Sequence, residues 1–250
     1  NLTARTTTGI EIAYYARTGK FYLSHTGTDG RIYTASSTNC RNWSAWNRNN
    51  APLEATYNGV AMTAGNFLYQ VHIGTNQKIY LRRNTNFTEP LRFSRWTEIN
   101  VPRTLTKHAV DLIKFKDRLY MIHVGLSDQL FISSSSNGIS GWSNWKQLPG
   151  RTKVTPTLST LKDVNGNDTK LAVAHTGTDG NVYFANNIDA ISWNNLTNGQ
   201  LGVIRHRVTL PHSLLEGAGL GLYYIRNSDG AVFEADPGGT RFLNGYSFKK

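Results

Sequence analysis

One ten-residue phrase recurs five times along this chain of 250 residues, and its spacing limits the folds that the chain can adopt. The copies read SHTGTDGRIY, VHIGTNQKIY, IHVGLSDQLF, AHTGTDGNVY and YIRNSDGAVF. The position that histidine holds in four of them falls, at intervals of 47 to 52 residues, at His25, His72, His123, His175 and Ile225. No linker or low-complexity tract interrupts this series. A period of this length predicts one repeat architecture over the whole chain.

Each copy of the phrase predicts a β-hairpin. In KFYLSHTGT the alternation places Phe21, Leu23 and His25 on one face of a strand. The pairs Asp29-Gly30, Asp179-Gly180 and Asp229-Gly230 then predict tight turns, because Gly, and Asp to a lesser degree, tolerates the positive φ that such turns require. The other two copies have TNQK and LSDQ at the turn, without the glycine. An aliphatic residue and an aromatic residue, Ile32-Tyr33 in the first copy, begin the second strand, and all five copies keep this pair.

Two further short strands are predicted in each repeat. One follows the phrase and is marked by tryptophan, at Trp46, Trp96, Trp145 and Trp193. The other precedes the phrase, in the segments GIEIAYYA, NGVAMTAG, AVDLIKFK and PTLSTLKD. We find no long segment of helical periodicity with an N-cap and a closing glycine. Four short strands in each repeat are typical of the blade of a β-propeller.

The sequence therefore predicts an all-β fold, a five-bladed β-propeller of four-stranded antiparallel blades with about 50 residues per blade. One domain is expected to cover residues 1–250, with approximate blades at 1–50, 51–100, 101–150, 151–200 and 201–250. Because each repeat runs from its innermost strand outward, closure of the ring is expected to rest on packing of the first blade against the last. A β-sandwich or β-solenoid and part of a larger propeller with six or seven blades are the alternatives.

The charge of the chain narrows the classes of partner. Its 27 Lys and Arg residues against 16 Asp and Glu give a formal net charge of +11, which favours anionic glycans or a negatively charged cell surface. The basic clusters are short and do not alternate with aromatic residues, so nucleic-acid binding is not expected. No apolar run approaches the roughly 18 residues of a membrane span, so membrane insertion is not expected either. The single cysteine, Cys40, permits no internal disulfide.

The pattern G-T-D-G-x-[IL]-Y followed by W-S-x-W resembles the repeats of bacterial β-propeller lectins of the Photorhabdus type, which bind fucose. The segment LFISSSSNGISGWSNWKQLPG is similar, more loosely, to the blade hairpins of sialidase-like propellers. Lectins of the first kind have more than five blades. The sialidase Asp-box, S-x-D-x-G-x-x-W, is not met because Asp29 directly precedes Gly30. The resemblance implies glycan binding at several equivalent sites and no sialidase chemistry.

The side chains that a sugar site needs recur in the repeats: aromatic rings for the apolar face of the sugar and planar polar groups for its hydroxyls. The predicted ligand-binding residues are Trp46, Trp96, Trp145, Trp193, His25, His72, His123 and His175. The alternative is that the tryptophans pack between blades and that each imidazole hydrogen-bonds to a neighbouring backbone or hydroxyl group. Asp29 and Asp179 are expected to form turns. We expect no metal and no cofactor, because equivalent strand positions diverge between blades.

These observations favour a non-catalytic carbohydrate-binding protein, a lectin with several repeat-related sites for cell-surface glycans, anionic ones included. A secreted or extracellular location and a role in cell adhesion, as part of a secreted protein or toxin, are expected with it. The runner-up is a glycoside hydrolase of the five-bladed propeller type, with candidate carboxylates at Glu11, Glu54, Asp111 and Asp163. A protein-interaction scaffold is the third class.

Overall fold

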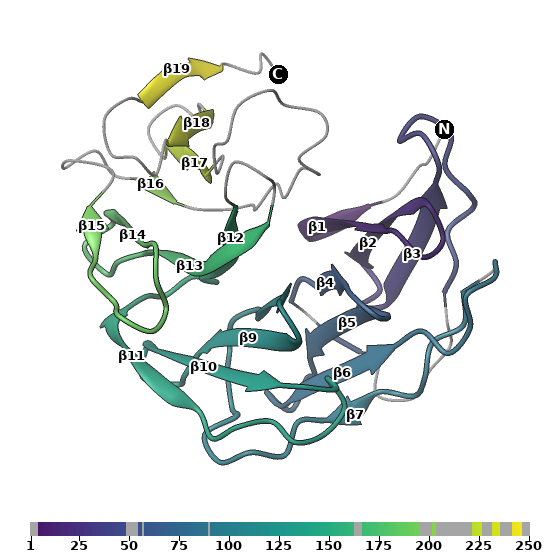
Figure 1. Ribbon diagram of the computed structural model, residues 1–250, viewed down its shortest axis with the longest axis horizontal. Coiled ribbons are helices and arrows are strands. Elements are labelled where there is room, and N and C mark those ends of the chain that lie inside the picture. The colour runs from purple at the N-terminus through teal and green to yellow at the C-terminus, as the bar shows by residue number, and fades with distance from the viewer. Residues whose placement is uncertain are drawn as a thin grey trace.

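The computed structural model describes residues 5–48, 55–56, 58–89, 91–162, 167–195, 202–203, 222–226, 232–235 and 242–246. The regular elements in these ranges are β-strands, and the strands form five antiparallel sheets (Figure 1). In this part of the chain no helix has the length and apolarity needed to cross a membrane. The prediction of an all-β fold built from antiparallel sheets is confirmed.

Each sheet is made of strands that follow one another in the chain. Sheet 1 contains β1 (Thr6–Tyr15), β2 (Lys20–Gly27) and β3 (Ile32–Ser37). Sheet 2 contains β4 (Ala61–Ala64), β5 (Leu68–Ile73), β6 (Ile79–Arg83) and β7 (Thr97–Glu98). Sheet 3 contains β8 (Asp111–Phe115), β9 (Arg118–Val124), β10 (Gln129–Ser135) and β11 (Lys146–Arg151). Sheet 4 contains β12 (Thr157–Lys162), β13 (Asp168–Thr176), β14 (Val182–Ala185) and β15 (Asn194–Asn195). Sheet 5 contains β16 (Gly202–Val203), β17 (Leu222–Arg226), β18 (Val232–Ala235) and β19 (Phe242–Tyr246).

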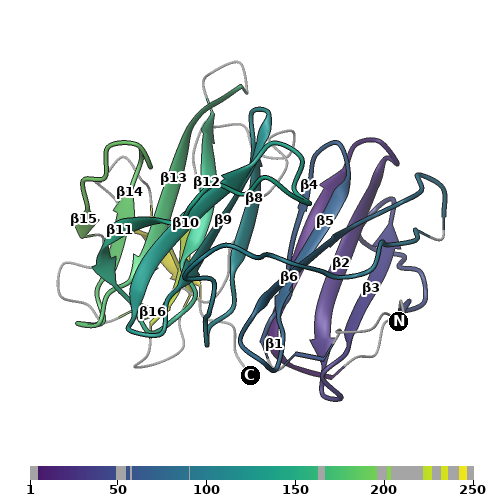
Figure 2. The same ribbon diagram turned by 90° about the horizontal axis from the view of Figure 1, so that it is seen from below.

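The five sheets lie in an arc around a common centre, in the order of the chain (Figure 1). Inner strands of neighbouring sheets contact one another, β1 with β4, β4 with β8, and β8 with β12. Figure 2, turned by 90°, shows that the long strands of the first four sheets lie roughly along one axis, with neighbouring strands antiparallel. In Figure 1 the described strands of sheet 1 and sheet 5 form the two ends of this arc. The predicted order of strands, from the innermost outward, is confirmed for the described strands.

The repeated phrase forms the turn between the second and third strands of a sheet. In sheet 1 the Gly30 amide donates to the Gly27 carbonyl over 2.9 Å, and the Gly27 amide donates to the Arg31 carbonyl over 2.7 Å. The last residue of the turn has a positive φ in the four described copies: Gly30 (72°), Gln77 (66°), Asp128 (67°) and Gly180 (81°). The predicted Asp-Gly turns are thus confirmed in sheets 1 and 4, and the pair Asp229-Gly230 lies outside the described residues.

The first glycine and the aspartate of the phrase fit the aromatic ring that follows them. A Cβ atom added at Gly27 would lie 2.8 Å from the ring of Tyr33, because that ring lies across the glycine. Asp29 accepts hydrogen bonds from the Arg31 amide, over 3.0 Å, and from the Tyr33 hydroxyl, over 2.8 Å. Asp179 is bonded in the same way to Asn181 and Tyr183. Asp29 and Asp179 are therefore turn formers, as expected, and the phrase specifies a structural unit.

A threonine before the inner strand of each of sheets 2, 3 and 4 forms a hydrogen bond with the turn of the preceding sheet. Its amide donates to the carbonyl of the positive-φ residue, in the pairs Thr56 to Gly30, Thr106 to Gln77, and Thr152 to Asp128, over 2.9 to 3.0 Å. Each threonine hydroxyl also accepts a hydrogen bond from the amide two residues further on. Backbone groups at the joints between sheets are satisfied in this way.

The core lies between neighbouring sheets. We call the face of a sheet that is turned toward the preceding sheet its front face, and the opposite face its back face. In sheet 1, which no sheet precedes, the back face is the one turned toward sheet 2. The apolar cluster between sheets 2 and 3 includes Tyr69, Val71, Leu81, Leu112, Leu119, Met121, Phe131 and Trp145. The cluster between sheets 3 and 4 includes Ile113, Ile122, Ile132, Leu158, Leu171, Val173 and Ala185. Ile10 and Tyr14, on the front face of sheet 1, are exposed. The predicted packing of the first blade against the last concerns side chains outside the described residues.

Candidate functional site

Each predicted histidine forms a unit with two aromatic side chains of its own sheet. The ring of His25 stacks on Tyr33, with centroids 5.5 Å apart, and meets the ring of Trp46 edge to face at 4.4 Å. The other units are His72 with Tyr80 and Trp96, His123 with Phe131 and Trp145, and His175 with Tyr183 and Trp193. The structure thus brings the eight predicted residues together in four pairs, one in each of sheets 1 to 4.

The histidines are closed off from solvent, with exposed fractions between 0 and 3%. Burial lowers the pKa of His123 to about 4, and the backbone of Val124 and of Arg103 opposes this shift. Burial likewise lowers the pKa of His175 to about 4, against the opposing influence of the Thr176 backbone and the Asp179 charge. The imidazoles of His123 and His175 are therefore neutral at pH 7.

The tryptophans differ in exposure. Trp96 and Trp145 are buried, whereas Trp46 and Trp193 are half-buried. The indole nitrogen of Trp145 donates to the hydroxyl of Thr104 over 3.2 Å, which is a contact with the segment that leads into sheet 3. Trp46 and Trp193 therefore keep part of their rings accessible, and Trp96 and Trp145 do not.

A chain of buried polar side chains crosses from sheet 2 to sheet 1. The Nε atom of Arg82 donates to Oε1 of Gln70 over 2.9 Å. The amide nitrogen of Gln70 donates to Oγ of Ser24, over 3.1 Å, and to Oγ1 of Thr34, over 2.9 Å. These four residues, which we call the polar cluster, are each at most 6% exposed. They place a guanidinium and a carboxamide at positions that hold Ser133 and Met121 in sheet 3 and Ala185 and Val173 in sheet 4.

The guanidinium of Arg82 lies against two aromatic rings. Its Cζ atom is 4.2 Å from the ring centroid of Trp96 and 4.7 Å from that of Phe93. Trp96 in turn meets the imidazole of His72, with centroids 4.3 Å apart. Phe93 is half-buried and is the side of this assembly that reaches the surface. Two of the predicted ligand residues, His72 and Trp96, therefore belong to the surroundings of the polar cluster.

Sequence reasoning missed the polar cluster, although a signal was present. Arg82 lies in the short basic run LRR, which reads as part of a solvated surface. When the repeats are aligned on their histidines, the residues equivalent to Arg82 are Ala35, Ser133 and Ala185, and those equivalent to Gln70 are Leu23, Met121 and Val173. Arg82 is the only charged residue among these four aligned positions, which otherwise hold small side chains. This difference is the signal in the sequence that identifies Arg82.

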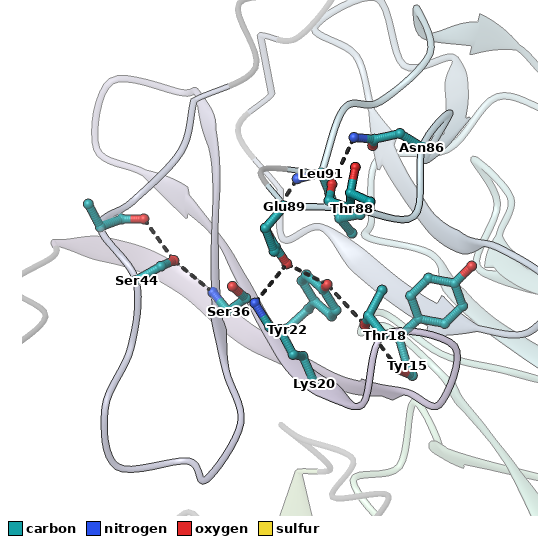
Figure 3. A network of polar contacts seen from close by, with 11 residues as sticks. Tyr15, Thr18, Lys20, Tyr22, Ser36, Ser44, Asn86, Thr88, Glu89 and Leu91 are labelled. Carbon is teal, nitrogen blue, oxygen red and sulfur yellow. Dashed lines mark hydrogen bonds and ion pairs between the residues drawn. The ribbon is translucent and has the colours of Figure 1, made fainter.

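A second polar network joins the same two sheets nearer the surface (Figure 3). Tyr22 donates to Oε1 of Glu89 over 2.6 Å, and the Lys20 ammonium lies 3.7 Å from the same oxygen. The amide of Leu91 donates to Oε2 over 3.2 Å. Burial, followed by the bond to Glu89, raises the pKa of Tyr22 well above its usual range. This network attaches the segment before Phe93 to sheet 1 and so fixes one side of the polar cluster.

Of the hydrolase carboxylates, the two that the structure describes, Glu11 and Asp111, lie in different sheets. Oδ2 of Asp111 accepts hydrogen bonds from the Leu158 amide, over 2.7 Å, and from the Thr157 hydroxyl, over 3.0 Å, so Asp111 connects sheets 3 and 4. Glu11 is half-buried on β1 in sheet 1, whereas Asp111 lies on β8 in sheet 3. Glu54 and Asp163 lie outside the described residues. Among the residues that are described, no three His, Cys, Asp or Glu side chains gather as metal ligands would.

The sequence matches no protein-family model and no curated protein. Its fold, in contrast, is shared with solved structures of low sequence identity. The lectin SapL1, solved with α-methyl fucoside, is 12% identical with a TM-score of 0.63, over 98% of this chain and 81% of that one. The lectin of Aleuria aurantia, a six-bladed β-propeller, is 12% identical with a TM-score of 0.62, over 98% and 79% of the two chains.

An enzyme also shares the fold. The α-L-arabinofuranosidase PaAbf62A from Podospora anserina is 16% identical with a TM-score of 0.51, over 79% of this chain and 70% of that one. Likeness at such identities is a likeness of fold, and the fold alone does not select a function. The sheets of this chain have the arrangement of a β-propeller, and the structures that they resemble include lectins and a glycosidase.

Proposed function

We propose that this protein is a non-catalytic lectin that binds a fucose-containing glycan between sheets 1 and 2. The observation that carries the proposal is the polar cluster, which places Arg82 and Gln70 between two sheets of a fold that fucose-binding lectins share. The resemblance of the repeats to fucose-binding propeller lectins supports the same ligand.

The chemistry of the cluster suits a sugar. A guanidinium offers several planar donors for ring hydroxyls, the carboxamide oxygen of Gln70 offers an acceptor, and the aromatic ring of Phe93 offers an apolar contact for the methyl group of fucose. Ser24 and Thr34 fix the carboxamide of Gln70, and Trp96 fixes the plane of Arg82. Because Arg82 is 1% exposed, the half-buried Phe93 side chain has to move aside when the sugar enters.

The energetic cost of the cluster supports a functional reason for it. Replacing buried ionic and polar groups by well-packed apolar side chains is often neutral or stabilising, by about 1–4 kcal/mol. Sheets 3 and 4 use such apolar residues at the positions of Gln70, namely Met121 and Val173. A polar cluster that stability alone does not require is expected where a site needs it.

The rest of the proposal concerns the whole molecule. We propose five blades in a single domain, a secreted or extracellular location, and adhesion to cell-surface glycans, anionic ones included. The other predicted pairs, His25 with Trp46, His123 with Trp145 and His175 with Trp193, are proposed as weaker repeat-related sites. In each of them the imidazole positions the indole. Trp46 and Trp193 are the stronger candidates for sugar contact because their rings are half-buried.

A glycan array tests this function. The intact chain is expected to bind fucosylated glycans, and Arg82→Ser, which copies sheet 3, is expected to lose them. The matched control is Ser133→Ala, at the equivalent position of sheet 3, which should bind like the wild type. Binding of no glycan, or equal binding by a folded Arg82→Ser variant, contradicts the proposal. Binding that disappears with moderate salt for all glycans contradicts it as well, because the net charge alone would then be responsible.

Glycoside hydrolysis is the second candidate, favoured by the fold shared with the arabinofuranosidase. It predicts release of arabinose from an arabinoside and loss of that release in Glu11→Gln. The proposed lectin predicts no release and unchanged glycan binding in the same variant. The bonds that Asp111 makes to sheet 4 argue for a structural role of this carboxylate.

A further inference from the structure

Two rings and two guanidiniums are stacked at the end of sheet 2 that carries the β4–β5 turn. Phe67, in this turn, stacks on Phe87, in the loop after β6, with ring centroids 5.8 Å apart. The Cζ atom of Arg17, from the β1–β2 turn, lies 3.7 Å from the ring centroid of Phe87. The Cζ atom of Arg83, the last residue of β6, lies 4.0 Å from the ring centroid of Phe67. These four side chains from sheets 1 and 2 form one assembly, which we call the cationic stack.

Both guanidiniums of the cationic stack are accessible to solvent. Arg17 is exposed and Arg83 is half-buried. Stacking on a ring fixes the plane of a guanidinium and leaves its N–H donors, which lie in that plane, available to a ligand. The ion pairs found within the described ranges are formed by two lysines, and neither arginine of the stack takes part in one. The stack therefore presents two positioned cations.

A third cation reaches the same turn from sheet 3. The side chain of Lys114, on β8, passes over Gly65, where an added Cβ atom would lie 3.0 Å from the Cγ atom of the lysine. Burial lowers the pKa of this ammonium, and the charge of Asp117 opposes the shift. Glu89, on the same loop as the stacked Phe87 ring, already accepts a hydrogen bond from Tyr22. The β4–β5 turn is thus bordered by cations from three sheets.

Groups of this kind recognise acidic groups that carry several oxygens. A sulfate or a carboxylate accepts two parallel hydrogen bonds from one guanidinium, and such charge-assisted bonds are about twice as strong as neutral ones. Each ring of the stack is already in contact with a guanidinium and with the other ring, whereas single-stranded nucleic acid binds to rings that are open to its bases. The chemistry of the stack therefore favours an acidic glycan over a nucleic acid.

The position of the stack connects it with the polar cluster. The loop between β6 and β7 carries Phe87, in the stack, and Phe93, which lies against the guanidinium of Arg82. Arg82 and Arg83 are neighbours in β6 and point to opposite faces of sheet 2. We propose that the cationic stack is a second binding site, which takes the sulfate or carboxylate groups of an acidic glycan. This proposal rests on the proposed lectin function, because the polar cluster holds the fucose of the same glycan.

Isothermal titration of the intact chain at about 0.15 M salt tests the proposal with three ligands. They are a sulfated fucose oligosaccharide, its desulfated form, and an oligogalacturonide, which carries carboxylates. The wild type is expected to bind the sulfated form about tenfold more tightly than the desulfated form. The double variant Arg17→Gln, Arg83→Gln should lose this difference and bind the desulfated form like the wild type, which also shows that it is folded. The acidic ligand that loses affinity in this variant identifies the group that the site takes.

The matched control is the double variant Lys107→Gln, Arg151→Gln, which lowers the net charge equally. Both side chains are exposed. They lie at the opposite end of the sheets, next to the threonines that bond to the turns of the repeated phrase. This control should keep the preference of the wild type for the sulfated form.

Several results would overturn the proposal. One is a wild type that binds both fucose ligands equally and does not bind the oligogalacturonide. Another is a preference for the sulfated form that the Arg17→Gln, Arg83→Gln variant keeps, or that the control loses equally, since the net charge would then be responsible. A third is a single-stranded oligonucleotide that binds as tightly as the sulfated form and is lost in the same variant.

The lectin proposal can fail separately in this experiment. A desulfated fucose ligand that does not bind to the wild type contradicts the lectin proposal. The acidic site still stands in that case if the sulfated form binds to the wild type and not to the Arg17→Gln, Arg83→Gln variant.

Discussion

The interface between sheets 1 and 2 and the interface between sheets 2 and 3 have the same architecture and opposite chemistry. Both have a His–Trp pair on the front face and the same register of strands. Between sheets 2 and 3 the facing side chains are mostly apolar, and the two positions hold Met121, in the apolar cluster, and Ser133, a small polar residue that bonds to Ser143 of its own sheet. Between sheets 1 and 2 the same two positions hold Gln70 and Arg82, in a hydrogen-bonded chain with Ser24 and Thr34. The repeat therefore maintains the fold, and a departure from it at two positions creates the candidate site.

The largest expected change in the free energy of unfolding comes from replacing Gln70 alone, which removes one member of the polar cluster and keeps Arg82. Gln70→Met removes the acceptor of the Arg82 Nε–H and the donor to Ser24 and Thr34, and leaves the guanidinium buried. Removing one partner of a buried charged network costs about 3–5 kcal/mol. Urea unfolding monitored by tryptophan fluorescence should show this loss of free energy of unfolding. A loss of less than about 1 kcal/mol would mean that Gln70 is not what satisfies Arg82.

Acid should weaken the apolar interface through its histidine. His123 has a folded pKa of about 4 because of burial, whereas an unfolded histidine titrates near 6.5. The unfolded chain therefore binds more protons, and the free energy of unfolding falls as pH drops from about 6.5 to 4. The contribution of His123 reaches about 3 kcal/mol and is then constant at lower pH. His175 should contribute a similar loss.

Unfolding free energies measured between pH 7 and pH 4 check this dependence. The matched variant is His123→Gln, which removes one titrating group. Its stability should fall less steeply with acid than that of the wild type. Equal slopes in the two proteins would show that His123 is not neutral and buried in solution.

Placing the residues of sheet 3 at the two equivalent positions of sheet 2 should remove the destabilisation that the buried polar cluster causes. The double variant Gln70→Met, Arg82→Ser removes both members at once and leaves no buried charge. It is expected to be as stable as the wild type or more stable by about 1–2 kcal/mol, in contrast with Gln70→Met alone. The double-mutant cycle gives the coupling energy of Gln70 and Arg82. Strictly additive effects would contradict the cluster.

The smallest expected change in stability comes from the turn between the second and third strands, which sheets 1 and 2 share with sheet 3. Gln77 has a φ of 66° at a position where sheets 1 and 4 have glycine. Gln77→Gly should relieve this strain, with a net gain of about 0.5 kcal/mol after the added entropy of the unfolded chain. Gly30→Ala should lose about 1 kcal/mol, because its φ is 72°. Equal melting temperatures for the three proteins would show that this position carries no strain.

The fold could be predicted from the sequence because it depends on repetition. The glycine, aspartate and tyrosine of the phrase fit one another locally, so their pattern predicts the turn in the first and fourth copies, which keep all three residues. The alternation around each histidine likewise predicts the strands. Closure of the ring was not predictable in this way, because it depends on how the first and last sheets meet.

The candidate site was predicted only in part. His72 and Trp96 were identified because they recur, and the structure places them beside Arg82. Gln70 and Arg82 were missed because they do not recur, and a search for repeated residues passes over them. Their contacts join segments from different repeats, as in the bond from Gln70 to Ser24, which no local pattern reveals. Positions that depart from a repeat are therefore as informative as those that keep it.

The central claim is that the polar cluster holds the sugar. The most direct measurement is a crystal structure of the intact chain with the fucoside that binds best on the array. We predict sugar density between sheets 1 and 2, with hydroxyl groups within hydrogen-bonding distance of Arg82 and Gln70 and with Phe93 moved from its place over the guanidinium. A fucoside bound elsewhere, with Arg82 still enclosed by Trp96 and Phe93, would contradict the account.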